Sequence, residues 1–250
     1  MKTKIISFGN HKGGVGKTTT AASVGSILAS KGYHVLLIDL DPQANLTFSM
    51  LSEECDVSSY NALIKREPLP RVKVSDHLDI VPSSLELEAA EMELISAISR
   101  ETILKRLLAP IKDEYDFILV DCRPSLTLLT MNAFAASTDI IVPLVPEVLP
   151  FKGLEAINNF IKGIQENLTP ETHLSGILIT KVEANNLHKN IEDNLREVMK
   201  DLVYKTRIRK NITLAEAPME SKDITKYSPK SNGAADYLAF TEELIKIYDK

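Results

Sequence analysis

A glycine-rich segment near the N-terminus has the residue types and the spacing of a phosphate-binding loop. Residues 9–20 read Gly-Asn-His-Lys-Gly-Gly-Val-Gly-Lys-Thr-Thr-Thr, between an apolar run at 5–8 and a helical pattern that begins near Ala21. Successive glycines let backbone N–H groups surround an anion, and the dipole of the following helix adds positive potential. Lys17 is placed to contact the β- and γ-phosphates, and the Thr18 hydroxyl is placed to ligate Mg²⁺. The segment therefore predicts a nucleoside triphosphate site.

The loop departs from the ordinary P-loop pattern at one point. Where that pattern has glycine five residues before Gly16, this chain has His11, and an extra lysine, Lys12, precedes Gly13 and Gly14. The alternative is a glycine-rich turn that binds no ligand. The Gly-Lys-Thr sequence between a strand and a helix argues against that alternative.

Acidic residues follow two of the predicted strands. Asp41 comes shortly after the apolar run 34–38, and Asp121 ends the run 117–121. Ligands of open α/β sheets bind at the carboxyl ends of the strands, so both carboxylates are expected to face the phosphates. Asp121 is expected to hold Mg²⁺ through a coordinated water, and Asp41 is a possible second metal contact. In the alternative, Asp41 and Asn45 only cap the next helix, and Asp121 is an N-cap.

The elements that must position these groups alternate along the chain. Strands are predicted at 5–8, 34–38, 78–82, 117–121, 140–146 and 175–180, and helices after the loop as far as 31–32 and at 85–98, 103–111, 152–164, 187–202 and 233–248. This alternation implies βαβ units, so the predicted fold is α/β, with a doubly wound, mostly parallel sheet and helices on both faces. No linker-like stretch or internal repeat interrupts the 250 residues, which are expected to form one domain.

Composition excludes several classes of protein. The formal net charge of −5 argues against nucleic-acid binding by the whole surface, so any such binding requires a local basic patch. Cys55 and Cys122 lie far apart without metal-ligand spacing, which argues against a disulfide framework or a Cys/His metal site. No apolar run reaches 18 residues, and the N-terminal run is too short for a signal peptide, so a cytoplasmic location is expected.

Together these segments resemble the deviant Walker-A ATPases of the ParA/Soj/MinD group. Residues 12–19 are similar to the signature loop, 39–45 and 121–125 to the two switches, and the similarity continues at 211–218 and 231–234. Asp-Pro-Gln-x-Asn at 41–45 resembles the partition ATPases of chromosomes and plasmids. A loop that starts at residue 9 leaves no room for a DNA-binding extension, which implies the short, Soj-like type. The polar face of the last helix is slightly acidic, whereas a membrane-targeting helix should be basic.

The resemblance implies an ATPase that forms a homodimer when it binds ATP and Mg²⁺. Lys12 would reach the partner's nucleotide, Lys17 and Thr18 would hold phosphate and Mg²⁺, Asp41 would orient the attacking water, and Asp121 would support the metal. Other nucleotide contacts would come from Gly13, Gly14, Val15, Gly16, Thr19, Arg209 and Asn211, the last two at the adenine. Two residues depart from the family pattern, because Arg123 and Arg209 stand where the family usually has proline.

The implied function is DNA partition. The ATP dimer would bind DNA non-specifically, associate with the nucleoid, and be released when a ParB-like centromere-binding protein stimulates hydrolysis; no membrane partner is expected. Residues 196–210 carry six basic and two acidic side chains, a net charge of +4. The predicted DNA contacts are Arg196, Lys200, Lys205, Arg207, Lys210 and Lys230, although for each a solvated surface position is an equal alternative.

Three other functions are alternatives for a chain with this loop. The first is a MinD-like ATPase that positions itself at a membrane or a cell pole. A reductase similar to nitrogenase iron protein would need two cluster-ligating cysteines, which the spacing of Cys55 and Cys122 does not provide. A bacterial tyrosine kinase would need a C-terminal tyrosine cluster, whereas Tyr237 and Tyr248 are isolated and expected on a buried helix face.

Overall fold

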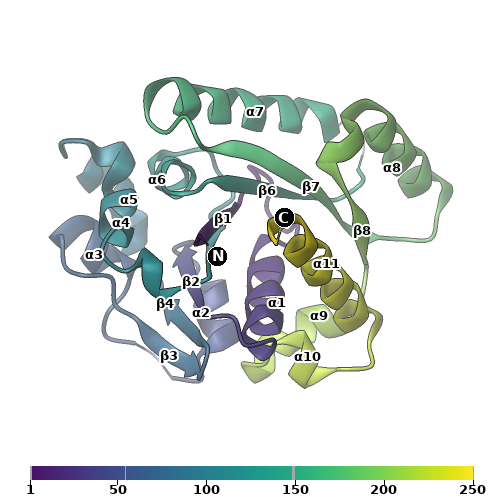
Figure 1. The fold of residues 1–250 in the computed structure, drawn as a ribbon, viewed down its shortest axis with the longest axis horizontal. Helices are drawn as coiled ribbons and strands as arrows, with labels where there is room; N and C mark the ends of the chain where they lie inside the picture. The colour runs from purple at the N-terminus through teal and green to yellow at the C-terminus, as the bar shows by residue number, and fades with distance from the viewer. Residues whose placement is uncertain (1, 54, 148–149, 250) are drawn as a thin grey trace.

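The computed structural model describes residues 2–53, 55–147 and 150–249, which build one eight-stranded sheet between two layers of helices (Figure 1). The spatial order is β3-β4-β2-β5-β1-β6-β7-β8, and neighbouring strands are parallel except for the antiparallel pair β3 and β4. The strands are β1 (Lys4–Phe8), β2 (Val35–Leu40), β3 (Val72–Ser75), β4 (Leu78–Val81), β5 (Phe117–Cys122), β6 (Asp139–Leu144), β7 (His173–Val182) and β8 (Val203–Arg209). The predicted doubly wound α/β fold is confirmed.

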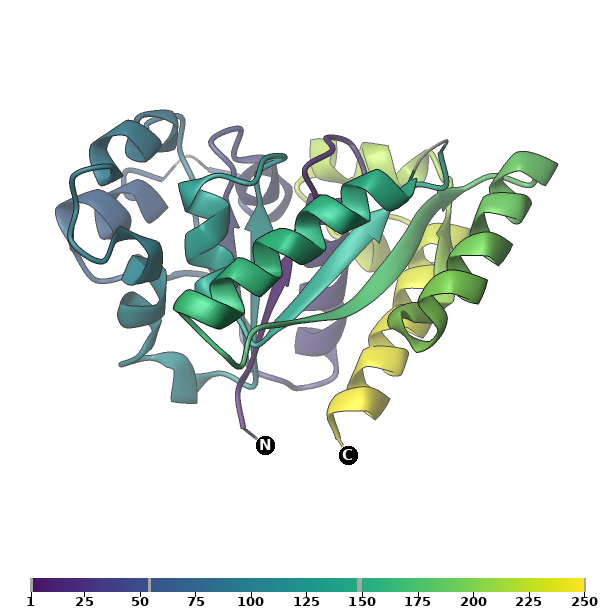
Figure 2. The same cartoon turned by 90° about the horizontal axis from the view of Figure 1, so that it is seen from above.

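The helices form two groups on opposite faces of the sheet, and Figure 2 views the molecule from the side of α7. One group is α1 (Lys17–Ser30), α2 (Asn45–Met50), α9 (Thr213–Glu216), α10 (Ile224–Tyr227) and α11 (Asn232–Tyr248). The other is α3 (Ser59–Lys65), α4 (Leu87–Leu94), α5 (Ile103–Leu108), α6 (Leu128–Ala136), α7 (Pro150–Asn167) and α8 (Asn186–Met199). None of the described helices has both the length and the apolar character needed to cross a bilayer.

The central strands are buried on both faces, which explains why they read as continuous apolar runs. In β2, Leu37 packs in the core on the α1 side and Leu36 in the core on the α6 side, and all six residues of the strand are buried. The parallel register places Phe8, Asp121 and Asp39 in one row across β1, β5 and β2. The glycine-rich loop and the predicted acidic residues therefore meet at one edge of the sheet.

The segment between residues 50 and 116 differs most from the prediction. The strand β3 and the helix α3 were not predicted, and the helices expected at 85–98 and 103–111 are shorter, at Leu87–Leu94 and Ile103–Leu108. Beyond α4 the chain turns through Ser99, at a φ of 50°, into a 3₁₀ helix at Arg100–Thr102. Ile98 continues the apolar spacing of α4 but is 88% exposed. Apolar spacing therefore extended the expected helix beyond the residues that the core can bury.

The last helix, α11, packs its apolar face against the sheet. Tyr237, Phe240 and Leu244 are buried, and the Phe240 ring meets the ring of Tyr204 edge-on with centroids 5.0 Å apart. Ile247 was expected on the same face, but it is 43% exposed because the face that packs on the core passes through Leu244, Ile245 and Tyr248. Tyr248 is partly buried against the same core, as expected.

Acidic side chains of α11 cap the outer edge of β8. The Glu243 carboxylate accepts hydrogen bonds from the backbone N–H groups of Lys205 (2.8 Å) and Thr206 (2.9 Å). The Asp236 carboxylate accepts one from the N–H of Arg209 at 2.9 Å. Three backbone donors of an edge strand are thus satisfied by side chains of a helix.

Candidate functional site

The loop between β1 and α1 is held in shape by its neighbours. Gly14 and Gly16 have φ values of 71° and 90°, a left-handed backbone that favours glycine. The buried Val15 anchors the loop, because its carbonyl oxygen accepts a hydrogen bond from Thr180 Oγ at 2.8 Å. Asn10 Nδ2 donates to the carbonyl oxygen of Pro143 at 2.8 Å. The ends of β6 and β7 therefore fix the curvature of the loop before any ligand binds.

Lys17 begins α1 and points into the curve of the loop. The residue is only 6% exposed, and its Nζ donates to the carbonyl oxygen of Lys12 at 3.0 Å. Burial lowers the pKa of Lys17, and the negative charge of Asp121 acts in the opposite direction. Thr18, in the first turn of α1, is half-buried and lines the adjoining cavity. The loop thus holds an ammonium group and a hydroxyl where phosphate and metal would lie.

The carboxylate of Asp39 organises the segment that follows β2. Asp39 is fully buried, and it accepts hydrogen bonds from Asp41 N (3.1 Å), Thr47 N (2.9 Å) and Thr47 Oγ (2.8 Å). Burial raises the pKa of Asp39 to about 6 despite these hydrogen bonds. From the sequence, Asp39 was expected only as the first residue of the switch-like segment 39–45, because its partner Thr47 is brought to it by the fold.

Asp41 lines the cavity at the mouth of the loop. It is 9% exposed, and its Oδ1 accepts a hydrogen bond from Gln43 N at 3.0 Å. Its carbonyl oxygen accepts from Ser83 Oγ at 2.8 Å, a support from the loop after β4 that the sequence did not reveal. The alternative that Asp41 and Asn45 cap α2 is wrong, because Asp39 binds the amide of Thr47 and the N-cap, Ala44, makes no side-chain cap bond.

Asp121 is a fully buried carboxylate without a hydrogen-bond partner. Within the described residues, neither of its oxygens accepts a hydrogen bond. Burial, and next the charge of Asp39, raise the pKa of Asp121 well above its usual range, although the nearby Thr18 hydroxyl and the charge of Lys17 act in the opposite direction. The N-cap alternative is wrong, because α6 has Thr127 as its N-cap. A divalent cation and its water ligands would supply the partners that the protein does not.

These residues fit Mg²⁺ held together with phosphates. Within the described residues, no three His, Cys, Asp or Glu side chains converge on a common metal position. Mg²⁺ commonly keeps several waters and takes one or two protein oxygens plus substrate phosphates. Thr18 and Asp121 are suited to such a site, and Asp41 lies close enough to the cavity to take part.

Replacing Asp121 with asparagine should stabilise the nucleotide-free protein while weakening its response to Mg²⁺. An unpartnered buried charge costs about 1–3 kcal/mol, so its removal should raise the melting temperature by roughly 2–4 °C or more at pH 7.5. Because the folded-state pKa is raised, the wild-type penalty appears as pH rises, and the gain should shrink toward pH 5.

Scanning calorimetry at several pH values, with and without Mg–ADP, measures both effects. The Mg²⁺-dependent part of the ADP stabilisation should be lost in the variant. An Asp121→Asn protein that melts below the wild type and still responds fully to Mg²⁺ would contradict this assignment.

Two adjoining cavities open at this edge of the sheet. The first, of about 450 Å³, is lined by the predicted residues Gly13, Gly14, Gly16, Lys17, Thr18, Thr19 and Asp41. The second, of about 310 Å³, is lined among others by Arg209 and Asn211. Phe48, Leu214 and Lys181 also line the first cavity. Leu214 lies in the segment 211–218 that resembles the family, but no local sequence pattern indicated Phe48 or Lys181, which reach the cavity only in the folded chain.

Lys12 lies at neither cavity. Its Nζ is 3.2 Å from Glu147 Oε2, and the two side chains are 47% and 58% exposed. An ion pair at such exposure contributes about 1 kcal/mol or less. Lys12 is therefore held only weakly and faces solvent.

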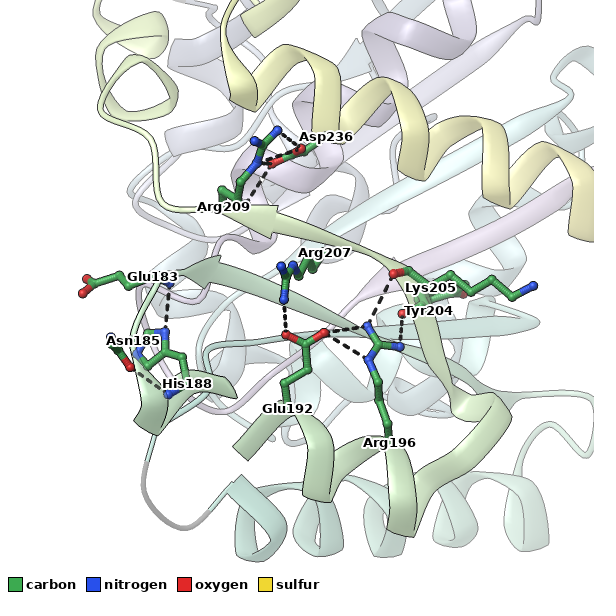
Figure 3. A network of polar contacts seen from close by, with 10 residues as sticks. All are labelled: Glu183, Asn185, His188, Glu192, Arg196, Tyr204, Lys205, Arg207, Arg209 and Asp236. Carbon is green, nitrogen blue, oxygen red and sulfur yellow. Dashed lines mark hydrogen bonds and ion pairs between the residues drawn. The ribbon is translucent and has the colours of Figure 1, made fainter. Parts of the chain in front are cut away.

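The two arginines in usual proline positions each bind acidic side chains. Arg209 donates from Nη2 to Asp236 Oδ1 at 2.6 Å and from Nε to Asp236 Oδ2 at 2.9 Å (Figure 3). Arg123 lies 3.5 Å from Glu88 and 3.4 Å from Glu91, both on α4. The guanidinium of Arg209 is thus committed to α11, while Arg123 ties the 121–125 segment to α4.

The basic stretch 196–210 is partly neutralised by acidic residues outside it. The buried Glu192 binds Arg207 Nη1 at 2.7 Å and Arg196 Nε at 3.0 Å (Figure 3). In addition, Lys210 Nζ lies 2.6 Å from Glu183. The expected excess of +4 therefore overstates the local charge. Lys200, Lys205 and Lys230 have no ion pair among the described residues, and these lysines provide the accessible positive charge.

Known proteins match this chain over almost its whole length. A family model described as an AAA domain matches residues 3–174. The chain is 40% identical to the sporulation initiation inhibitor protein Soj of Bacillus subtilis over 247 residues, which cover 96% of this chain and 98% of that protein. It is 36% identical to the chromosome partitioning protein ParA of Myxococcus xanthus over 250 residues, 97% of this chain and 88% of the relative.

A solved structure shares the fold closely. Cobyrinic acid a,c-diamide synthase from Mycobacterium smegmatis, with bound ADP and magnesium, superposes with a TM-score of 0.87 at 31% sequence identity. The match covers 99% of this chain and 96% of that chain.

Proposed function

We propose, from the premise that this chain belongs to the family of ParA/Soj-type partition ATPases, that it is an ATP-timed switch for DNA segregation. In this proposal the chain binds ATP and Mg²⁺, forms a homodimer, and holds DNA without sequence preference. A ParB-like centromere-binding protein then stimulates hydrolysis and releases it. Family membership supports the partition ATPase. The formation of a dimer, the binding of DNA and the stimulation of hydrolysis by a partner are proposed here in addition.

The observation that carries the proposal is that two lysines of one loop lie in different surroundings. Lys17 is buried and bonded inside the loop, whereas Lys12 is exposed and outside both cavities. Lys17 can therefore neutralise phosphate charge within its own chain. Lys12 is available to a nucleotide on a second copy, where a cation supplied in trans would act like an arginine finger.

Hydrolysis in this proposal depends on position and charge. Bound Mg²⁺ would neutralise phosphate charge, and Asp121 and Thr18 are the residues suited to hold it. Lys17 binds the terminal phosphates, and the Asp41 carboxylate orients a water molecule and accepts its proton. Gln43 N and Ser83 Oγ both donate hydrogen bonds to Asp41. The orientation of its carboxylate therefore does not depend on bound substrate.

DNA binding in this proposal uses three exposed lysines, which lie just before β8, within β8 and just before α11. Lys200, Lys205 and Lys230 make no ion pair among the described residues, so they can neutralise phosphates without breaking contacts within the chain. Before they could bind DNA phosphates, Arg196, Arg207 and Lys210 would first have to give up their ion pairs with acidic side chains of the chain itself. A dimer doubles the number of phosphate contacts, which makes DNA binding depend on ATP.

Titration of unrelated DNA duplexes with ATP-loaded protein tests the function. If each half of the dimer neutralises two or three phosphates, log Kd should change with log salt concentration with a slope magnitude of roughly 4 to 5. The double variant Lys205→Glu and Lys230→Glu should weaken DNA binding at least about 10-fold without changing ATP affinity. The matched control Lys162→Glu, an exposed lysine of α7, should change it less than about 2-fold.

Two results would contradict the partition function. One is DNA affinity that does not depend on salt, and the other is tight DNA binding by the ADP-bound monomer. Sedimentation with liposomes in the presence of ATP provides the comparison, because binding to liposomes and not to DNA would favour a MinD-like positioning ATPase.

A further inference from the structure

The two cavities of the nucleotide site share a small set of residues. Gly16, Thr19, Lys181, Leu214 and Ala215 line both of them. The first cavity contains the phosphate-binding loop, and the second is bounded by residues 208–212. A nucleotide that fills both must place its sugar and its first phosphate at the shared residues. Lys181 is the only charged residue among the five.

The position of Lys181 is fixed relative to the loop. The preceding residue, Thr180, donates from Oγ to the carbonyl oxygen of Val15 at 2.8 Å, and this bond ties the end of β7 to the loop. One residue later, the backbone N–H of Lys210 donates to the carbonyl oxygen of Val182 at 3.0 Å. Lys181 therefore lies between two hydrogen bonds, one to the phosphate-binding loop of the first cavity and one to residue 210 of the second cavity.

The backbone of Lys181 is strained. Its φ of 53° lies in the left-handed region, which costs a residue with a Cβ about 1–2 kcal/mol. Such conformations persist where the surroundings enforce them, and they are concentrated at functional sites. Glycine would relieve this strain, yet the chain has a lysine at the junction of the cavities.

The charge of Lys181 is also uncommitted. Its neighbours at the second cavity, Arg209 and Lys210, are paired with Asp236 and Glu183. Lys181 itself is exposed and has no ion pair among the residues that the structure describes. An anion at the junction would therefore meet a cation that gives up no contact to bind it.

We propose that Lys181 is a further nucleotide-binding residue, whose ammonium group contacts the phosphate nearest the sugar. This inference rests on the proposed ATP-binding function and adds a second lysine to the chain's own phosphate contacts. Lys17 serves the terminal phosphates, and Lys181 serves the phosphate at the junction. Because the junction phosphate is common to ATP and ADP, Lys181 should strengthen the binding of both.

Calorimetric titration of Mg–ADP into matched variants tests the proposal. Lys181→Met keeps the length of the apolar stem and removes the charge, and it should raise Kd about 10-fold, as expected for one charge-assisted hydrogen bond. Lys181→Arg should bind within about 3-fold of the wild type, because it restores a cation. Lys189→Met is the control, since Lys189 is an exposed lysine of α8 that lines neither cavity.

The outcomes separate this proposal from the function on which it rests. Wild-type binding of Mg–ADP together with unchanged binding by Lys181→Met overturns the role of Lys181 and leaves the ATPase function standing. Equal weakening by Lys189→Met also overturns it, because the effect would then come from removing any exposed positive charge and not from a contact at the junction. If the wild type itself binds no adenine nucleotide, both the function and this inference fail. Melting temperatures without nucleotide verify that each variant is folded.

Discussion

Replacing Lys17 with alanine is expected to abolish binding of both ADP and ATP. Lys17 is the buried ammonium group inside the loop, and among the described residues it donates a single hydrogen bond, to the carbonyl oxygen of Lys12. Without it, the terminal phosphates would meet no cation within the curve of the loop. Loss of several charge-assisted contacts predicts an increase of at least about 100-fold in Kd.

Lys12→Ala is the matched variant in the same loop, and its effect should fall on a different step. Lys12 lies outside both cavities, so nucleotide affinity should stay within about 3-fold of the wild type. ATP-dependent dimerisation or hydrolysis should be lost, because the cation offered to the partner's nucleotide is gone. Calorimetry with Mg–ADP and sedimentation velocity with ATP measure the two steps. Wild-type dimerisation and hydrolysis by Lys12→Ala would contradict the assignment of Lys12 as the residue acting in trans.

Asp41→Ala is expected to trap a long-lived ATP dimer. The change removes the carboxylate that orients the attacking water, and loss of a positioned base slows proton transfer by about 10²- to 10⁴-fold. The backbone of Asp41 should stay in place, because Ser83 Oγ binds its carbonyl oxygen independently of the side chain. Lys17 and Thr18 are untouched, so ATP should still bind.

A second variant separates the charge of Asp41 from its packing. Asp41→Asn retains an oxygen that can accept the hydrogen bond of Gln43 N, and it removes the base. Both variants should elute as dimers with ATP on size-exclusion chromatography and hydrolyse it slowly. A monomer with ATP still bound, or hydrolysis by Asp41→Asn at the wild-type rate, would count against the role of Asp41.

The fold was largely predictable because its signals are local. The buried strands β2 and β5 read as unbroken apolar runs, and the loop at 9–20 carries its glycines, lysine and threonines within one short segment. The helices α3 and α6 and the edge strand β3 were missed: α3 and β3 are too short for their apolar spacing to be recognised, and α6 is buried on nearly all sides, so it has no polar face to reveal a helical period. In those segments tertiary contacts outweigh local preference.

The parts of the site that were not predicted depend on contacts between distant residues. Asp39 and Asp41 are the same residue type at almost the same place in the sequence. Only their hydrogen-bond partners distinguish them, and those of Asp39 include Thr47, eight residues later. The basic stretch was counted without Glu183 and Asp236, each of which is 27 residues from the side chain that it neutralises. Residue types and spacing indicated the chemistry of the loop, but charge pairing required the folded chain.

The acidic caps on β8 restrict how copies of this chain can meet. An edge strand with unsatisfied N–H groups is a template for pairing with a strand of another molecule, which leads to continuous sheets and aggregation. Glu243 and Asp236 already occupy three of those donors on β8. At the opposite edge, β3 has only four residues and carries the exposed Lys73. The chain is therefore protected against polymerisation by strand addition at both ends of its sheet, which leaves other surfaces for the association of two copies.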